Sequence, residues 1–253
     1  MNYKQFEDNI FAEWRKRSVA NGDGCELASD GLLYRGRFVY KDGYWSREPG
    51  NENAIWERAK RRVLILTKDL NDEEAWDIRA ETGRNNFSGE NNVVVSAPFY
   101  KNLMRWVYGL LTIDANGHAK KFAEIDRQDV YQPFYDQAPV ARVNCKKQVG
   151  KSSIETSVLK SYMERYKDLL VKQIAAYDAN ILLCCGASGA IKDFVAENYL
   201  TDLLKLNNWV YYSPRTHKMV IDSWHPTYTG DTHEKMYSDM MSGVEEAWSR
   251  IKL

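Results

Sequence analysis

The sequence has few cysteines: only Cys25, Cys145, Cys184 and Cys185 occur among its 253 residues. No two of them form a C-x-x-C pair, and Cys184 and Cys185 are neighbours in an apolar run, where a strand would point them to opposite faces. This spacing does not fit a disulfide framework, an iron–sulfur cluster or a zinc site. We expect free, buried thiols, and the sequence indicates neither a metal nor a cofactor.

Long apolar stretches are also absent. No run approaches the roughly 18 residues that a membrane-spanning helix requires. The first residues, "MNYKQFEDNIFAEWRKR", are charged and amphipathic and lack the apolar region of a signal peptide. These features predict a cytoplasmic protein without a membrane partner.

The chain has no excess of charge of either sign, since 35 Lys and Arg balance 35 Asp and Glu. Proteins that bind nucleic acids are usually basic, so this balance argues mildly against such a partner. The lysines and arginines are still numerous enough to form a local basic groove. Composition therefore leaves a nucleic-acid partner open.

What the sequence does contain is the material for a packed core, with 44% hydrophobic residues, 8 Trp and 16 Tyr. The runs "RVLILT", "PVARVNC" and "ANILLCCG" have strand length and are typical of parallel strands buried on both faces. "NWVYYS" and "HKMVID" predict two further strands around a "PRT" turn.

Segments with helical spacing alternate with these strands. The expected helices are 3–18, 51–61, 97–112, 152–178, 187–200 and 231–253. Pro98 suits a first helical turn, and Ser152 or Ser153 can cap the long helix, with Glu155 completing a capping box. "LLYRGRFVYKDGYW" predicts a hairpin, and the polar stretch 71–95 predicts a long functional loop.

The alternation predicts a doubly wound α/β fold: three α/β/α layers around a central, mostly parallel sheet. No linker or repeat divides the chain. We expect a single domain over 1–253, with an N-terminal helix and hairpin extension at about 1–60.

Polar residues follow several of these strands. The first strand delivers Thr67, Lys68 and Asp69, the second delivers Asn144, and the last delivers His225 within "SWHPTY". In open α/β sheets, ligands bind outside the carboxyl ends of the strands. Pro cannot donate to a sheet ladder, so the last strand must stop where it presents His225.

These residue types suit one kind of chemistry. An Asp can position or deprotonate a water, and an Asn can read an amide-like base edge with a donor and an acceptor. A His can donate to an oxygen that becomes negative as a bond to its ring breaks. An aromatic side chain can stack on a planar base, and Phe87, Phe99 and Tyr100 are candidates.

The order of these motifs resembles the uracil-DNA glycosylase superfamily. "LILTKDLND" resembles its first catalytic loop, and "SAPFYKNLMRWVYGLL" its Pro-then-helix segment. "VARVNCKK" resembles the strand that supplies a base-reading Asn, "ILLCCGASGAIKDF" the strand, Gly and helix that follow, and "WHPTY" the His-Pro loop. The resemblance spans roughly 61–228 and implies a uracil-DNA glycosylase-like fold.

The resemblance also implies roles and a partner. Asp69 falls on the water-activating carboxylate, Asn144 on the base-reading amide, and His225 on the imidazole that stabilises the leaving base. Phe99 or Tyr100 lies near the stacking aromatic. The implied activity is hydrolysis of the N-glycosidic bond of uracil or a related damaged base, with DNA as the partner.

Two positions depart from the family pattern. Thr67 stands where the family usually has Gly, and Leu70 where it usually has Pro. Because Gly lets the backbone approach a substrate, Thr67 can narrow the pocket. These departures and the zero net charge favour an alternative: a binding protein of the same fold that recognises nucleic acid, a nucleobase or a nucleotide without turnover.

Ordinary structural roles compete with these assignments. Asp69 and Asn144 are common turn residues, His225 can be a structural histidine, and Lys146 and Lys147 are expected on a solvated edge. "VGKSS" is not a P-loop, because Cys145 stands where that motif needs Gly. A helix beginning near 150–152 could still bind a phosphate.

A geometric expectation separates these readings. Three buried runs end in three different polar residues, so Asp69, Asn144 and His225 should converge on one cleft at the carboxyl edge of the sheet. An aromatic side chain between Phe87 and Tyr100 should line it. Lys68 and Arg84 are the expected phosphate contacts.

Overall fold

The computed structural model describes residues 1–253 except 42, 71–73, 87–92, 96, 151–153 and 252. Its main feature is a seven-stranded sheet in the order β1-β7-β4-β8-β11-β10-β9. The strands are β1 (Gly31–Leu32), β4 (Val63–Thr67), β7 (Val140–Asn144), β8 (Ile181–Cys185), β9 (Leu204–Lys205), β10 (Val210–Ser213) and β11 (Lys218–Ser223).

The middle of this sheet is parallel. Strands β7, β4, β8 and β11 pair in parallel, whereas β1, β10 and β9 are added antiparallel at the two edges. Every residue of β4, β7 and β8 is buried, as their near-continuous apolar runs predict. The mostly parallel central sheet is therefore confirmed.

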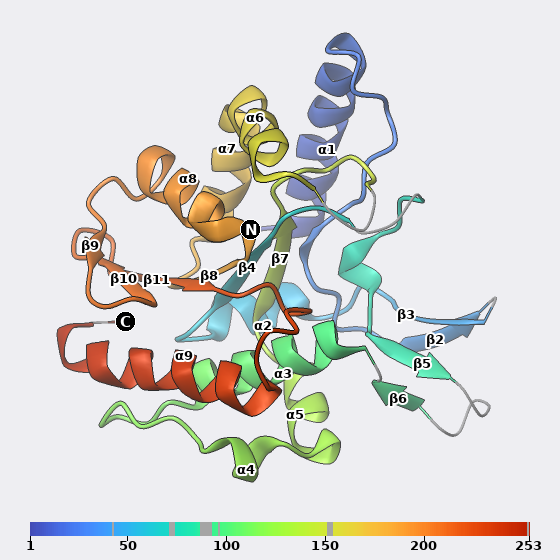
Figure 1. The fold of residues 1–253 in the computed structure, drawn as a ribbon. Helices are drawn as coiled ribbons and strands as arrows, with labels where there is room; N and C mark the ends of the chain where they lie inside the picture. Colours follow the sequence, from blue (N-terminus) through green and yellow to red (C-terminus); the bar gives the residue numbers. More distant parts are fainter. Residues whose placement is uncertain (42, 71–73, 87–92, 96, 151–153, 252) are drawn as a thin grey trace.

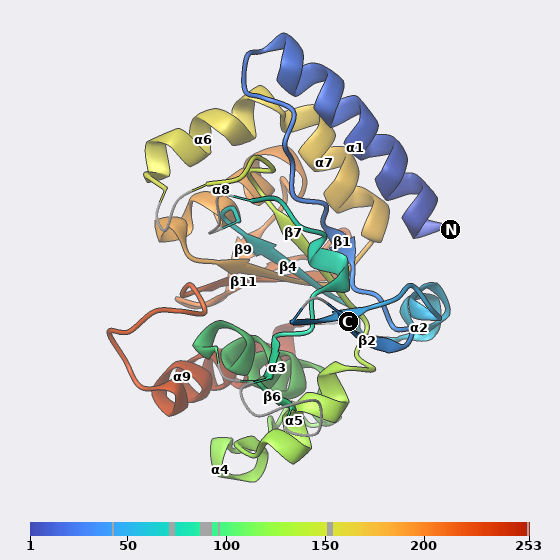
Figure 2. The same ribbon diagram turned by 90° about the vertical axis from the view of Figure 1, so that its right-hand side faces the viewer.

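Helices cover both faces of the sheet, which gives the three expected layers (Figure 2). One face carries α1 (Tyr3–Ala20), α6 (Thr156–Arg165), α7 (Lys167–Tyr177) and α8 (Ala190–Asn198). The other carries α3 (Pro98–Thr112), α4 (Phe122–Ile125), α5 (Gln128–Tyr135) and α9 (His233–Ala247). Alternate strand residues feed the two cores, and Cys184 and Cys185 point to opposite faces as expected.

The N-terminal region combines α1 and β1 with a hairpin of β2 (Phe38–Lys41) and β3 (Tyr44–Arg47), followed by α2 (Glu52–Arg58). Strand β1 joins the main sheet beside β7, so this region is tied to the central layer. Figure 1 shows the β2–β3 hairpin next to a second small hairpin, β5–β6. The single domain stays a prediction.

The described part of the segment 71–95 contains regular structure where a long loop was expected. It holds a short 3₁₀ helix, η1 (Ile78–Ala80), and the β5 (Arg84–Asn86) and β6 (Val93–Val95) hairpin. Helices α4 and α5 and strand β9 were not anticipated. Two further 3₁₀ turns, η2 (Ala187–Gly189) and η3 (Trp248–Arg250), precede α8 and follow α9.

The long helix expected over 152–178 was wrong as a single element. It begins at Thr156, with Glu155 at the N-cap, and breaks at Tyr166 into α6 and α7. The expected caps Ser152 and Ser153 lie outside the described residues. Pro98 does open α3, as predicted.

Two other expectations can be compared with the structure. The thiols of Cys145, Cys184 and Cys185 are free and buried, but Cys25 is exposed, so its expected burial was wrong. Among the helices of the described residues, none is long and apolar enough to cross a membrane.

Candidate functional site

The ends of β7, β4, β8 and β11 lie side by side, and we call this the carboxyl edge. In register, Thr67 is opposite Asn144, and Ser223 is opposite Cys185. The ladder continues beyond the strands, because the Gly186 N–H donates to the carbonyl of Ser223 over 2.8 Å. Thr67, Asn144 and His225 thus share one edge, as the strand-end argument predicts.

His225 is held by the turn that follows β11. Its carbonyl accepts from the Tyr228 N–H over 2.8 Å. Helix α3 fixes the next residue, because Asn102 Nδ2 donates to the Pro226 carbonyl over 2.7 Å. The turn that presents His225 is therefore clamped from within and from α3.

The imidazole of His225 has a defined protonation state at neutral pH. Burial, assisted by the charges of Lys68 and Arg142, lowers its pKa to about 4. Nδ1 accepts from the Thr227 N–H at 3.3 Å and pairs with Thr227 Oγ1 at 2.7 Å. Since a backbone N–H can only donate, the neutral ring carries its proton on Nε2. The ring is a neutral donor.

Phe99 is the aromatic side chain next to this imidazole. Its ring centroid lies 5.8 Å from that of His225, with the two planes at 46°. Tyr100 packs edge-on against Phe99 and turns toward Gly83, where an added Cβ would lie 2.4 Å from the Tyr100 ring. The structure thus separates two residues that the sequence left equivalent. Phe87 lies outside the described residues.

Asn144 is fully buried at the end of β7. Its side-chain oxygen accepts from the Thr67 hydroxyl, and its backbone N–H donates to Asp30 Oδ2 over 2.8 Å. Within the described residues, its amide nitrogen Nδ2 has no hydrogen-bond partner. Thr67 therefore occupies the acceptor of this amide and leaves its donors unused.

Asp69 contacts the segment that follows β7, and in the described residues it forms no hydrogen bond or ion pair with His225. Its side chain is 7% exposed, 4.0 Å from Lys146 Nζ. A Cβ added to Gly150 would lie 2.6 Å from Asp69 Oδ2, so the chain at Gly150 covers the carboxylate. Burial raises the pKa of Asp69, and the charges of Lys146 and Lys68 oppose that shift.

Lys68 connects the two acid–base candidates electrostatically. Its positive charge favours the carboxylate form of Asp69, against the larger effect of burial, and it favours the neutral form of His225. The Lys68 carbonyl accepts from the Lys146 N–H over 2.8 Å, but in the described part of the chain its ammonium forms no hydrogen bond or ion pair and is available to a ligand. Of the two predicted phosphate contacts, Lys68 and Arg84, it is Lys68 whose charged group, within the described residues, is free to bind a ligand.

Arg142 is a site residue that the sequence reasoning missed. It lies two residues before Asn144 on the same face of β7, with its guanidinium carbon 4.6 Å from the Phe99 ring centroid. Its Nη1 donates to Glu81 Oε2 over 2.9 Å. A charged residue inside an otherwise apolar strand was the signal that could have identified it.

Three basic residues do not behave as expected. Arg84 pairs with Asp136 and lies over the Phe38 ring at 3.9 Å, so it does not face the carboxyl edge. The solvated edge expected at Lys146 and Lys147 was wrong. Lys146 Nζ donates to the carbonyls of Gln148 and Val149, and Lys147 is fully buried.

A buried polar network explains the position of Lys147. Its Nζ lies 2.7 and 2.9 Å from the two oxygens of Asp30, which is itself fully buried. Asp30 also accepts from Gln173 Nε2 over 2.8 Å and from the Asn144 N–H. Four hydrogen bonds thus satisfy this buried carboxylate and fix the backbone of Asn144.

The phosphate site expected near 150–152 can be compared with the structure only at Gly150. Gly150 contacts the Asp69 carboxylate, and α6 begins only at Thr156. Residues 151–153 lie outside the described part.

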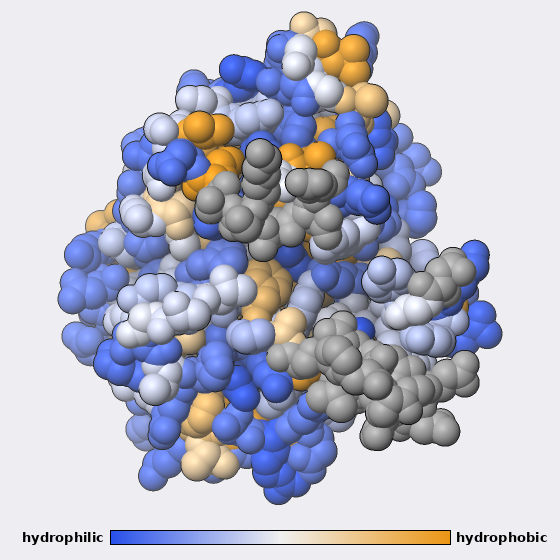
Figure 3. Space-filling model, turned by 45° about the vertical axis from the view of Figure 1, so that its right-hand side comes forward, coloured by the Kyte–Doolittle hydropathy of each residue, from blue (hydrophilic) through white to orange (hydrophobic). Residues whose placement is uncertain are grey.

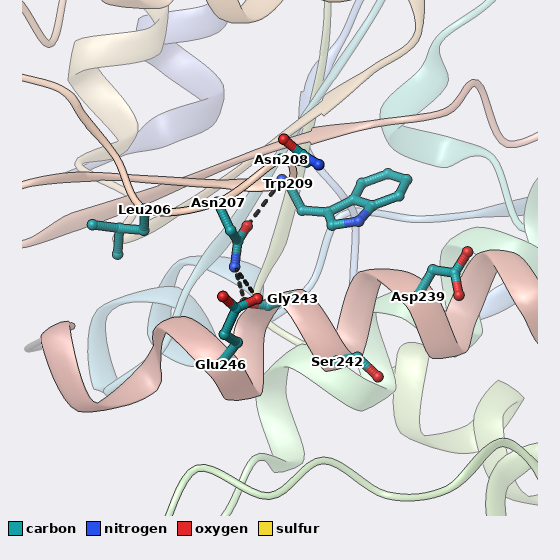
Figure 4. A pocket seen from close by; sticks show the side chains of 8 residues that line it. All are labelled: Leu206, Asn207, Asn208, Trp209, Asp239, Ser242, Gly243 and Glu246. Carbon is teal, nitrogen blue, oxygen red and sulfur yellow. Dashed lines mark hydrogen bonds between the residues drawn. The ribbon is translucent and has the colours of Figure 1, made fainter.

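Figure 3 views the molecule from the side on which α3 begins, and apolar atoms show at the centre of this face between hydrophilic ones. Two pockets among the described residues lie elsewhere. One, of about 460 Å³, lies between the β9–β10 turn and α9, with Trp209, Asp239 and Glu246 in its wall (Figure 4). The other, of about 340 Å³, lies between the segment 119–123 and α9.

The described residues include no group of three or more His, Cys, Asp or Glu side chains arranged to hold a metal ion. The groups at the carboxyl edge are instead suited to binding a planar ligand: an aromatic ring, two amide N–H bonds, a neutral imidazole N–H and nearby cations.

Comparison of the sequence with models of known protein families found no match. A comparison with curated proteins found no similar sequence either.

Proposed function

We propose that this protein is a DNA base-excision glycosylase that hydrolyses the N-glycosidic bond of uracil or a related damaged base. The observation that carries the proposal is the position of His225, whose Nδ1 pairs with Thr227 Oγ1 and whose ring lies beside Phe99, on the edge that also holds Asn144. DNA is the proposed partner and the cytoplasm the proposed compartment.

In this mechanism the target base leaves the DNA stack and enters the carboxyl edge, at a cost of a few kcal/mol. Phe99 stacks on its ring. The Asn144 amide N–H groups are buried in this structure, so they donate to an acceptor on the base edge only after the base displaces the residues that cover them. As the bond to the sugar breaks, negative charge develops on a base oxygen. The neutral His225 ring donates a hydrogen bond from Nε2–H to that oxygen and so stabilises the negative charge on the base.

Asp69 would direct water to the sugar carbon. Water supplies the hydroxyl to that carbon, and its remaining proton is balanced by protonation of the departing base. The raised pKa of Asp69 makes its carboxylate a better proton acceptor than an exposed Asp. Lys68, between Asp69 and His225, supports binding of the flanking phosphate.

Release of uracil from a labelled oligonucleotide tests the proposal, measured at low salt to help a neutral protein bind DNA. We expect Asp69→Asn and His225→Gln each to lower the rate roughly 10²- to 10⁴-fold. Asp129→Asn and His118→Gln are matched controls, because both side chains are largely exposed and lie outside the carboxyl edge. Activity that survives both test substitutions unchanged would refute these roles.

A second candidate is a non-catalytic protein that binds a nucleic acid, a nucleobase or a nucleotide at the same edge. One observation favours it: the Asp69 side chain is only 7% exposed and lies under Gly150, which restricts the approach of water. Affinity for oligonucleotides or free bases without turnover would support it. Efficient base release would exclude it.

A further inference from the structure

Three aromatic rings form a stack beside the turn that carries His225, and we call Trp209, Trp224 and Tyr228 the aromatic stack. The ring centroids of Trp209 and Trp224 are 4.1 Å apart, with the two planes tilted by 53°. Those of Trp224 and Tyr228 are 6.2 Å apart, with the planes only 11° from parallel. Trp209 lies next to β10, so the stack begins against the sheet and ends on the turn.

The outer end of the stack is partly exposed. Tyr228 is 43% exposed, and in the described part of the chain its ring contacts no aromatic ring other than Trp224. Gly230 packs against the hydroxyl end of the Tyr228 ring, where an added Cβ would lie 2.1 Å from the hydroxyl, so the remainder of the ring is what a ligand can reach. Trp224 and Tyr228 lie on either side of His225 in sequence, and the Tyr228 N–H bond to the His225 carbonyl closes the turn. The Tyr228 ring is therefore fixed relative to the imidazole.

We propose that Tyr228, supported by Trp224, stacks on an unpaired base of single-stranded nucleic acid, next to the nucleotide whose base enters the carboxyl edge. This inference deepens the proposed function and rests on it for the ligand at His225. Aromatic side chains bind successive bases of a single strand in this way, without sequence preference. A base inside a duplex offers no free face to Tyr228.

The charge around the turn fits a phosphate backbone. Lys68 lies near His225, and Lys101 near His233, at the two ends of the segment 225–233. In the described residues, neither ammonium group forms a hydrogen bond or ion pair. The acid of this segment, Asp231, is 3.5 Å from Lys235 Nζ, an ammonium that it shares with Asp239 at 2.6 Å.

The inner end of the stack sets the direction of the strand. Trp209 borders the pocket of Figure 4, whose wall includes the carboxylates of Asp239 and Glu246. These acids disfavour phosphates there. The strand therefore extends from Tyr228 toward Lys68 and away from Trp209.

Fluorescence anisotropy of a labelled single-stranded oligonucleotide, with the matched duplex in parallel, tests the proposal at low salt. We expect Tyr228→Ala to weaken single-strand binding roughly five- to hundredfold, since one stacked base contributes about 1–3 kcal/mol. Tyr228→Phe keeps the ring and should stay within about twofold. Tyr44→Ala is the matched control, because Tyr44 is 77% exposed on the separate β2–β3 hairpin.

Lys68→Gln should also reduce the slope of log affinity against log salt by about 0.7, the value for one contact to a single strand. No oligonucleotide binding by the wild type, no loss in Tyr228→Ala, or an equal loss for duplex and single strand would each overturn the inference. Base release is measured separately. Loss of binding in Tyr228→Ala without any base release would support the stack and refute the glycosylase, whereas base release with unchanged binding would do the reverse.

Discussion

Replacing His225 by Gln should remove a pH-dependent part of the protein's stability. The folded state holds the imidazole neutral, because burial and the cations Lys68 and Arg142 lower its pKa from 6.5 to about 4. The unfolded chain takes up a proton near 6.5. Between these two values the unfolded state binds more protons, so the free energy of unfolding falls as the pH falls.

The size of this effect follows from the pKa shift. At about 1.4 kcal/mol per pKa unit, a fall from 6.5 to about 4 corresponds to at most about 3.5 kcal/mol. The ring is only partly buried, and solvent screens the charges around it. We therefore expect about 1–2 kcal/mol to be lost from the wild type between pH 7 and pH 4 through this residue.

Urea denaturation at several pH values between 4 and 7.5 measures the effect. The wild type should lose about 1–2 kcal/mol more than His225→Gln across this window. His118→Gln is the control, because the His118 side chain is 73% exposed, and its profile should follow the wild type.

Parallel profiles for the wild type and His225→Gln would refute the neutral, shielded imidazole. A direct titration of His225 in the folded protein that gave a pKa near 6.5 would also refute it, because the pKa of the ring would then be unshifted. If the protein releases a base, protonation of His225 should not slow the reaction until the pH falls well below 6.5.

Two further predictions concern the buried polar groups behind the site. Lys147→Met leaves the Asp30 carboxylate buried without its cation, so the free energy of unfolding should fall by about 3–5 kcal/mol. Adding Asp30→Asn to this variant should recover part of the loss. Unchanged stability of Lys147→Met in urea denaturation would contradict the ion pair. Thr67→Val removes the hydroxyl that donates to Asn144 at nearly constant shape and should cost about 1–3 kcal/mol, whereas Thr67→Ser should stay close to wild type; equal denaturation midpoints for Val and Ser would contradict that hydrogen bond.

The central strands could be predicted because burial on both faces leaves a direct trace in the sequence. Runs such as "RVLILT" have no polar alternation, which is how a strand between two helical layers must look. The break between α6 and α7 left no such trace. It depends on Tyr166, whose ring stacks on Trp14 at 5.6 Å and whose hydroxyl donates to Asp23 over 2.6 Å. Such contacts come from distant segments.

The sequence predicted those parts of the candidate site whose position is set by the end of a strand. The positions of Asn144 and His225 follow from parallel topology, and the structure brings both to one edge. The pairing of Phe99 with Arg142 and His225 could not be predicted, because it depends on how α3 is rotated against the sheet. The burial of Lys147 was hidden because Asp30 lies 117 residues earlier in the chain.

The network around Asp30 also constrains the order in which the chain can fold. Asp30 and β1 are synthesised early, yet their partners β7, Lys147 and Gln173 emerge much later. Closing so long a loop has a large entropic cost that local contacts do not offset, so this edge should form after the helices have begun to assemble. The Asn144 amide hydrogen, which depends on Asp30, would then become protected from solvent exchange late, together with the carboxyl edge that it supports.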